Sequence, residues 1–382
     1  MTIAIVGVGE TQYRMRDGRP VETLVLEAVR RALDDAGLEP ADVDGFALEG
    51  HSMSRRVRAD ELSPRLGLRD RAFTAQSSLA GAGVVGAAQL AELAIDAGLA
   101  SVVVSYYGTS LSSTVGGPYS HHAADPRKAA FEMPFGFYGQ PVYFAMLAQR
   151  YAHEYGLEPE QTGAVAVAAR AMAARTPGAI QQEPMTIDDY LASPFVAEPL
   201  RKPDCCLIND GGVAFVMTSL ERARSLRRAP VVLAGAGFAS SSVSETDFFS
   251  QNREYLTTAA RASGARAFRR AGLTPADVDV AEIYDCFTVS TILQLEDLGF
   301  VAKGEGAAAA ADGLIGPDGA LPVNTHGGLL SQSFMVGANH VVEAVRQLRG
   351  ERAAGQIEGA EVVLVAGLGA QDHATAILTK DR

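Results

Sequence analysis

The sequence contains no tryptophan, only three cysteines and no apolar run approaching the roughly 20 residues that a membrane-spanning helix needs. A membrane span is therefore not expected. Cys205 and Cys206 are adjacent and Cys286 is the third, so the odd count excludes a disulfide framework. Free thiols indicate a reducing compartment, and we expect a cytoplasmic protein.

Positive charge is also scarce, with 33 Lys and Arg against 45 Asp and Glu and a net charge of -12. This balance excludes non-specific binding to nucleic acid or to an anionic membrane surface. Cys-x-x-Cys and His-x-x-x-His spacings are absent, so we expect no metal site in this chain. Gly7–Gly9 lacks the third glycine of a dinucleotide-binding fingerprint, and residues 1–6 lack the basic segment of a secretory signal.

The strongest positive feature is an internal repeat. Residues 3–9 (IAIVGVG) and 231–237 (VVLAGAG) are apolar runs that end in Gly-x-Gly, and residues 36–44 (AGLEPADVD) differ from 271–279 (AGLTPADVD) at one position. In each nine-residue stretch, glycine suits a left-handed helix end and Pro-Ala-Asp suits a tight turn that starts the next element. The sequence therefore predicts two copies of a β-α-β-α-β unit.

A third, looser pair supports the duplication. Residues 83–98 lead into the apolar run 100–105, and residues 337–350 lead into 361–366. The unrepeated stretch 106–203 predicts an insertion that shapes a binding site. It holds a Gly/Pro/His-rich loop and two amphipathic helices, expected at 116–126, 140–155 and 159–174. The expected domains are residues 1–225, which include the insertion, and residues 226–382.

Four segments resemble the sterol-carrier-protein and lipid-transfer-protein branch of the thiolase superfamily, and the resemblance covers essentially the whole chain. They are residues 203–212 (PDCCLINDGG), 282–288 (EIYDCFT), 324–337 (NTHGGLLSQSFMVG) and 347–351 (QLRGE). The resemblance implies a thiolase fold, in which the duplicated halves form a five-layer αβαβα sandwich. It also implies a coenzyme A thioester as substrate and a homodimer.

The thiolase catalytic groups are missing from the matching positions. Gly81 stands where the family has the cysteine that carries the acyl group, and Gly367 stands where it has the second cysteine. Phe334 replaces the histidine of Gly-His-Pro, and Tyr284 replaces a further polar catalytic residue. Ser78 is a possible substitute nucleophile, but a hydroxyl at its ordinary pKa needs an adjacent base.

Tyr284 and the missing cysteines make the chain similar to the steroid side-chain aldolases of this branch. The resemblance implies retro-aldol cleavage of a bulky β-hydroxyacyl-CoA to a ketone and a shorter acyl-CoA, without an acyl-cysteine. It also implies a zinc-ribbon/OB-fold partner protein that completes a heterotetramer. A second tyrosine of that subgroup is Phe334 here. Either Tyr284 works with a histidine, for which His326, His340 and His373 are the candidates, or this chain has a different substrate or no aldolase activity.

The expected catalytic residues are Tyr284, His326 and Asp285. A tyrosine base would need a lowered pKa, which Asp285 alone would oppose. Backbone N–H groups of glycine-rich turns suit the enolate oxygen of the thioester. The expected substrate-binding residues are Ser78, Gly327, Gly328, Phe334, His340, Gly367 and Gly369.

Other interpretations stay open at this stage. Tyr284 could be a buried tyrosine with a satisfied hydroxyl, and each histidine could have a structural role. The chain could also be an acyltransferase or condensing enzyme that uses Ser78 or a partner's thiol. From another class, it could be a catalytically silent subunit that binds acyl-CoA. We expect no cofactor held by this chain.

Overall fold

The computed structural model describes residues 2–50, 57–68, 70–113, 126–241, 254–369 and 371–381. In this part of the chain a nine-stranded mixed sheet has the order β3-β2-β4-β7-β1-β8-β11-β10-β9. Its strands are β1 Ile3–Glu10, β2 Gly45–Leu48, β3 Phe73–Gln76, β4 Val102–Ser110, β7 Asp210–Ser219, β8 Val231–Ser240, β9 Val280–Ile283, β10 Val362–Leu368 and β11 Asp372–Lys380. A separate hairpin pairs β5 Phe195–Ala197 with β6 Leu200–Arg201.

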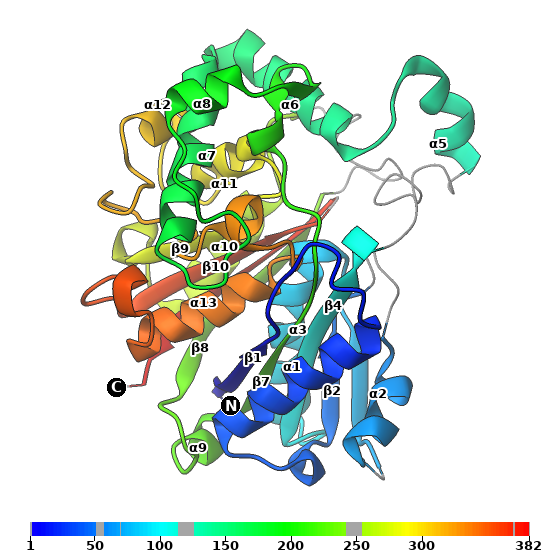
Figure 1. Ribbon diagram of the computed structural model, residues 1–382. Helices are drawn as coiled ribbons and strands as arrows, with labels where there is room; N and C mark the ends of the chain where they lie inside the picture. The colour runs from blue at the N-terminus through cyan, green and yellow to red at the C-terminus, as the bar shows by residue number, and fades with distance from the viewer. Residues whose placement is uncertain are drawn as a thin grey trace.

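The helices cover and separate the two halves of this sheet (Figure 1). They are α1 Val21–Ala36, α2 Ala59–Leu66, α3 Ala80–Asp96, α5 Pro126–Phe131, α6 Gln140–Tyr155, α7 Pro159–Ala174, α8 Ile187–Ala192, α9 Leu220–Ala223, α10 Ala260–Ala271, α11 Thr288–Asp297, α12 Gly306–Ala311 and α13 Ala338–Arg349. Helix α1 packs on β1, β4 and β7, whereas α10 packs on β8 and β11. Helices α3 and α13 contact strands of both halves. This arrangement gives the five layers expected for a thiolase fold.

The two half-sheets join where β1 meets β8. The pairing there is antiparallel and short, with Ala4 opposite Val232 and Ile5 opposite Val231. Beyond these pairs the two halves diverge, and α3 and α13 fill the space between them. The sequence predicted two β-α-β-α-β units, and the structure shows that their first strands are neighbours.

The repeated Gly-x-Gly motifs bring the outer helices close to the sheet. A Cβ on Gly9 would lie 2.5 Å from the backbone nitrogen of Ala32 in α1, and a Cβ on Gly237 would lie 2.8 Å from that of Ala267 in α10. Both distances are far below van der Waals contact, so any side chain would push the helix away. The motif therefore has the same packing role in both halves.

The repeated Pro-Ala-Asp turns also have matching roles. Each forms a short 3₁₀ turn, η1 Pro40–Asp42 and η5 Pro275–Asp277. The aspartate two residues further on is Asp44 in the first half and Asp279 in the second. It accepts hydrogen bonds from the backbone amides at the start of β4 or β10, the strand that pairs with the one following the turn. The nine repeated residues thus end one helix and anchor the start of β4 or β10.

The inserted segment lies at one end of the molecule, where α6, α7 and α8 gather beside α11 and α12 (Figure 1). Helices α6 and α7 have the bounds predicted from the sequence. Strand β4 continues to Ser110 and remains paired with β7, so the chain leaves the sheet four residues after the predicted start of the insertion at residue 106. Most of the predicted 116–126 loop lies outside the described residues, and the domain boundaries stay a prediction.

No helix of the described part is long and apolar enough to cross a membrane. All three cysteines are free thiols.

Candidate active site

Tyr284 lies against Gly81, the residue expected at the position of the acyl-carrying cysteine. It directly follows β9, and its backbone amide donates to the carbonyl of Ala366 in β10. A Cβ on Gly81 would lie 2.7 Å from Cε2 of Tyr284 and closer still to its Cδ2. A cysteine at residue 81 and the observed ring position of Tyr284 are therefore mutually exclusive.

The second cysteine position is filled as well. A Cβ on Gly367 would lie 2.9 Å from Cγ2 of Val85 and closer still to the carbonyl oxygen of Gly81. Residues 81 and 367 therefore lie in contact across the boundary between α3 and β10. Gly81 and Gly367 thus leave the space that the ring of Tyr284 and the neighbouring backbone occupy.

The N-terminus of α3 is already paired with a negative charge. The carboxylate of Glu49 accepts a hydrogen bond of 2.8 Å from the backbone amide of Ala80, the first residue of the helix. The positive end of a helix dipole stabilises a nearby anion. In this chain Glu49 supplies that anion, at the helix end that would otherwise stabilise a thiolate.

Ser78 lacks the partner that an activated nucleophile requires. Its hydroxyl donates to the carboxylate of Asp372, and its carbonyl accepts from the amide of Gly50 at 2.7 Å. A carboxylate alone is a weak base for a serine hydroxyl, and none of the three candidate histidines bonds to Ser78. The geometry gives Ser78 a structural role at the turn before α3.

Burial changes the protonation expected of Tyr284. Desolvation raises its pKa well above the ordinary value, and nearby Cys286, Cys206, Tyr107 and Glu49 act in the same direction. The lowered pKa that a tyrosine base would need is thus opposite to the observed environment. The Tyr284 side chain is therefore a neutral phenol at neutral pH.

A cluster of four ionisable side chains lies next to Tyr284. His326 Nδ1 is 3.0 Å from Glu282 Oε2, His326 Nε2 is 3.0 Å from His340 Nδ1, and His340 Nε2 is 3.3 Å from Asp285 Oδ1. All four side chains are buried. A Cβ on Gly337 would lie 3.2 Å from Cδ2 of Tyr284 and 3.6 Å from Cδ2 of His340, so these two rings flank one turn. The structure thus brings His326, His340 and Asp285 together with Tyr284, as the sequence predicted.

The cluster combines groups with opposite pKa shifts. Burial raises the pKa of Glu282 to about 7, although His340 and Thr325 oppose the rise. Burial and the neighbouring His340 lower the pKa of His326 to about 3. At pH 6, Glu282 is therefore largely a neutral acid, near pH 7 it is about half ionised, and His326 is a neutral imidazole at both pH values.

Glu282, His326 and His340 also have the composition of a metal site, because each offers one ligand atom within 4.8 Å of the others. The two ring nitrogens at 3.0 Å, however, already pair with one another as a hydrogen bond. Glu282 Oε2, His326 Nδ1 and His340 Nε2, in contrast, are buried and have no hydrogen-bond partner in the described part of the chain. The sequence prediction that this chain holds no metal stays a prediction.

Two of the glycine amides expected to bind the enolate oxygen already have acceptors, Gly327 in the turn beside the cluster and Gly369 in the turn between β10 and β11. Gly327 N–H donates to the carbonyl of Asn324 at 2.7 Å, and Gly369 N–H donates to that of Asp372 at 2.8 Å. Neither is free for an enolate oxygen in this conformation. Gly328 has a different constraint, because its Cβ would collide with the carboxylate of Asp285. The π-helical turn η6, Gly328–Gln332, begins at this residue.

Phe334 and His373 lie outside the polar cluster. Phe334 is buried in the apolar core, and its backbone amide donates to Asn209 Oδ1 at 2.6 Å. His373 lies on β11, where Nδ1 pairs with Ser263 Oγ at 2.6 Å and Nε2 pairs with Gln294 Oε1 at 3.2 Å. Burial lowers the pKa of His373 to about 3. These bonds give His373 a structural role between β11, α10 and α11.

Glu282 was missed as a member of the site, and so was Asn339, whose Nδ2 lies 3.1 Å from His326 Nε2. A signal for Glu282 was present in the sequence. It is the one charged residue in the otherwise apolar strand β9, and it lies two positions before Tyr284. Asn339 had no such signal, because its contact depends on how α13 meets the glycine turn.

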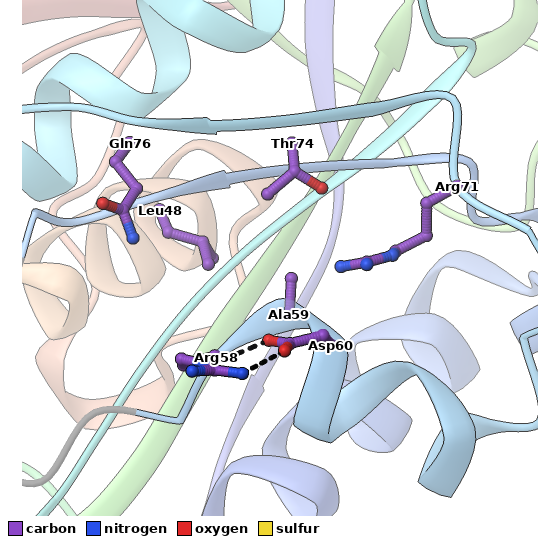
Figure 2. Close-up of a pocket in the computed structure, with 7 residues that line it drawn as sticks. All are labelled: Leu48, Arg58, Ala59, Asp60, Arg71, Thr74 and Gln76. Carbon is purple, nitrogen blue, oxygen red and sulfur yellow. Dashed lines mark hydrogen bonds and ion pairs between the residues drawn. The ribbon is translucent and has the colours of Figure 1, made fainter.

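A surface pocket of about 380 Å³ lies elsewhere, at the β3 edge of the sheet. Figure 2 shows Arg58, Ala59 and Asp60 at the start of α2 facing the strand side chains. The pocket is lined by Leu48, Arg58, Ala59, Asp60, Arg71, Thr74 and Gln76. It contains none of the predicted site residues, and Arg58 is already paired with Asp60.

The chain is similar over nearly its full length to proteins that are named as lyases or aldolases. The chain is 38% identical over 379 residues to 17-hydroxy-3-oxo-4-pregnene-20-carboxyl-CoA lyase of Mycobacterium tuberculosis, covering 96% of each chain. It is 36% identical over 375 residues to a steroid side-chain-cleaving aldolase of Thermomonospora curvata, covering 96% of this chain and 95% of the relative. The chain belongs to the thiolase-like family.

The family model for the thiolase C-terminal domain-like region matches residues 241–380 of this thiolase-like chain. Among solved structures, the Ltp2-ChsH2(DUF35) aldolase superimposes with a TM-score of 0.92 and 36% identity, covering 100% of this chain and 98% of that one. The expectations of a thiolase fold and of similarity to steroid side-chain aldolases are confirmed.

Proposed function

We propose that this chain is a carbon–carbon lyase that cleaves a bulky β-hydroxyacyl-CoA by a retro-aldol reaction. The observation that carries the proposal is the position of Tyr284, whose ring lies against Gly81 and leaves no room for a cysteine at that residue. A ligand at this site meets a neutral phenol in place of a thiolate. Such a site can stabilise and protonate an enolate. Burial raises the pKa of the neighbouring Cys206 and Cys286 thiols, so neither is an activated nucleophile that could hold an acyl group.

The reaction balances without a covalent intermediate. The β-hydroxyl passes its proton to water or to the carboxylate of Asp285, the bond between the α and β carbons breaks, and a ketone forms from the β carbon. The electron pair passes to the thioester as an enolate, and its α carbon takes up one proton to give the shorter acyl-CoA. Tyr284 is suited to donate that proton or to hydrogen-bond the thioester oxygen, because its phenol remains protonated at neutral pH.

The substrate class follows from the named relatives. A pregnene carboxyl-CoA is the substrate named for one of them, and steroid side-chain cleavage is named for the other. We propose a steroid or similarly bulky terpenoid β-hydroxyacyl-CoA for this chain. The steps above need no redox cofactor, because no electrons are gained or lost.

The assembly is also a proposal. The solved aldolase combines an Ltp2 chain with a ChsH2(DUF35) chain. We propose a homodimer of this chain that binds two copies of a zinc-ribbon/OB-fold partner to form a heterotetramer. The three free cysteines suit a cytoplasmic setting for this assembly.

The first test is turnover by a Tyr284→Phe variant. The chain and its DUF35-type partner are incubated with a steroid β-hydroxyacyl-CoA, and the ketone and the shorter acyl-CoA are quantified by liquid chromatography and mass spectrometry. Loss of the phenol should lower kcat by about 10²-fold or more with little change in substrate binding, as for other positioned acids. Tyr155→Phe, at an exposed ring of α6, is the matched control and should keep full activity.

Full turnover by Tyr284→Phe would exclude the role of Tyr284. Acyl transfer that Ser78→Ala abolishes would support an acyltransferase, and acyl-CoA binding without turnover in any partner context would support a silent subunit.

A further inference from the structure

The main-chain carbonyl of Tyr284 is held by a side chain of α11. Gln294 Nε2 donates to this carbonyl at 2.8 Å and to the carbonyl of Ser290 at 2.8 Å. The hydroxyl of Ser290 also lies 3.3 Å from the Tyr284 carbonyl, but the carbonyl of Phe287 is a nearer acceptor for its hydrogen, at 2.6 Å. Gln294 is therefore the principal donor to Tyr284, and its side chain is buried.

The two carbonyls fix which way the amide of Gln294 points. A carbonyl oxygen only accepts hydrogen bonds, so the NH₂ group, which has two hydrogens, must face Tyr284 and Ser290. The opposite orientation would place the amide oxygen against two carbonyl oxygens with no hydrogen between them. Gln294 Oε1 therefore faces away from Tyr284, and there it lies 3.2 Å from His373 Nε2 of β11.

This contact decides the tautomer of His373. Burial lowers its pKa to about 3, so the ring is neutral at pH 7 and carries one hydrogen. Because Gln294 Oε1 can only accept, that hydrogen lies on Nε2. His373 Nδ1 is then an acceptor for the hydroxyl of Ser263 at 2.6 Å, which is nearer than the carbonyl of Ala260 at 3.2 Å. Since Ser263 gives its hydrogen to the ring, the hydroxyl of Thr375, at 2.9 Å, must donate to Ser263.

The result is a series of hydrogen bonds that all donate towards Tyr284. Its members, in order, are Thr375, Ser263, His373, Gln294 and the carbonyl of Tyr284. The four side chains that support the carbonyl are each at most 1% exposed. Side chains buried to this degree do not touch a substrate, so they act on the reaction only through the tyrosine.

Support at the carbonyl is important because the backbone of Tyr284 is held from both sides. Its amide donates to the carbonyl of Ala366 in β10 at 3.1 Å, and its carbonyl accepts from Gln294 of α11. Fixing both peptide groups fixes the direction in which the side chain leaves the backbone, and the ring then lies against Gly81. A catalytic group must be held within about 0.5 Å of its productive position, and a shift of about 1 Å can lower the rate about 10²-fold.

We propose that Gln294 and His373 are positioning residues of the lyase, in which His373 keeps the amide of Gln294 turned towards Tyr284 and thereby holds the phenol in its productive position. The sequence presented His373 as a possible partner of Tyr284, and the hydrogen bonds give it this indirect role. The proposal deepens the lyase function proposed above and rests on that function for its activity readout.

The tautomer of His373 is the direct test, and it does not depend on turnover. Nitrogen-15 NMR of the wild-type protein with labelled histidine at pH 7 should show the proton of His373 on Nε2. The loss of its signals in a His373→Gln variant assigns them. A proton on Nδ1 would overturn the proposal, because Nε2 could then only accept and the NH₂ group of Gln294 would have to turn away from Tyr284.

Two variants of His373 measure the effect on catalysis, with the DUF35-type partner and a steroid β-hydroxyacyl-CoA. His373→Leu removes the donor to Gln294 and should lower kcat about 10-fold to 10²-fold, while KM stays within about twofold. His373→Gln places an amide donor near the position of Nε2, so kcat should return to within about threefold of the wild type. A residue that only stabilised the fold would not change kcat per folded molecule.

Gln294→Met is the second test, because methionine keeps the length of the side chain but has no amide hydrogens. It should lower kcat as far as His373→Leu does, with urea unfolding used to confirm that the protein is folded. Thr218→Val is the matched control. The hydroxyl of Thr218 in β7 donates to the carbonyl of Ser101 at 2.7 Å, so valine removes one hydrogen bond of a buried side chain and should keep wild-type kcat.

Three kinetic results would overturn the proposal. Folded His373→Leu or Gln294→Met with wild-type kcat would show that Tyr284 needs no such support. A kcat for His373→Gln as low as that of His373→Leu would show that the donor to Gln294 is not what matters. An equal fall in Thr218→Val would show that the loss follows stability alone.

A wild-type protein that cleaves no β-hydroxyacyl-CoA would refute the lyase function but would not decide the positioning role. Carbon-13 NMR of ring-labelled tyrosine then decides it, with Tyr284 assigned by its loss in Tyr284→Phe. The ring signals of Tyr284 should shift in His373→Leu and Gln294→Met and return in His373→Gln. Signals that stay unchanged in all three variants would contradict the proposal.

Discussion

Residues 81, 284 and 367 define the chemistry of this site through their sizes. Gly81 and Gly367 leave no room for side chains, and Tyr284 takes the volume that a cysteine at residue 81 would need. Glu49 meanwhile pairs with the helix end that would stabilise a thiolate. The ring of Tyr284 fills the space beside residue 81, and Glu49 already pairs with the N-terminus of α3. Adding one cysteine to this chain would therefore not restore thiolase chemistry.

A Gly81→Cys variant tests this complementarity. Overpacking against Tyr284 should lower the free energy of unfolding by about 1–3 kcal/mol, even though glycine is a poor helix former. Urea unfolding should show this loss, and the variant should show no acyl-cysteine during incubation with acyl-CoA. The same substitution in a Tyr284→Ala background should cost markedly less, since the ring has been removed. Equal costs in both backgrounds would mean that the two residues do not compete for space.

At the scale of secondary-structure elements, the duplicated motifs position the site by packing helices tightly on strands. Because Gly9 and Gly237 have no side chains, α1 and α10 can pack closely on the outer faces of the sheet. Helices α3 and α13 lie between the half-sheets. Helix α7 also packs on the glycine turn, where a Cβ on Gly327 would meet the Cβ of Ala173 at 2.5 Å. The inserted segment thus supports the turn that accompanies His326.

A Gly237→Ala variant should therefore be strongly destabilised. The added methyl group meets the backbone of α10, which cannot move as a flexible side chain can. We expect a loss of about 3 kcal/mol in the free energy of unfolding, at the upper end of typical overpacking costs. Gly316→Ala is the control, because its Cβ would meet its nearest neighbour at an ordinary 3.7 Å. Similar unfolding midpoints for the two variants would contradict the packing role of the motif.

Local patterns predicted these elements well, because they depend on neighbours in the sequence. Helices α6 and α7 and the two Pro-Ala-Asp turns follow from periodicity and turn chemistry. Tyr284, His326, Asp285 and His340 came from a resemblance between motifs. The direction of the pKa shift of Tyr284 could not be predicted, because it depends on burial against residues from distant segments. The contact between Asn339 and His326 likewise arises only when α13 meets the glycine turn.

At the scale of the whole molecule, buried neutral histidines link stability to pH. His373 joins β11 to Ser263 of α10 and Gln294 of α11, and burial lowers its pKa to about 3. An unfolded histidine has a pKa of about 6.5. The unfolded chain therefore binds a proton between pH 6.5 and pH 3 that the folded chain does not. The stability that His373 contributes is complete above pH 6.5 and is lost as the pH falls towards 3.

Acidification should accordingly destabilise the wild type more steeply than a His373→Gln variant. Between pH 6.5 and pH 5 the slopes of the free energy of unfolding should differ by up to about 1.4 kcal/mol per pH unit. Urea titrations at several pH values measure both slopes. Parallel curves for the two proteins would show that His373 is not held neutral in the fold.

The central claim is that cleavage proceeds at Tyr284 without an acyl-enzyme. Intact-protein mass spectrometry of samples quenched during steady turnover of a steroid β-hydroxyacyl-CoA, with the DUF35-type partner present, tests it most directly. The account predicts accumulating ketone and shorter acyl-CoA while the chain keeps its unmodified mass throughout. A chain that gains the mass of an acyl group during turnover, mapped by peptide analysis to Ser78 or to a cysteine, would contradict it.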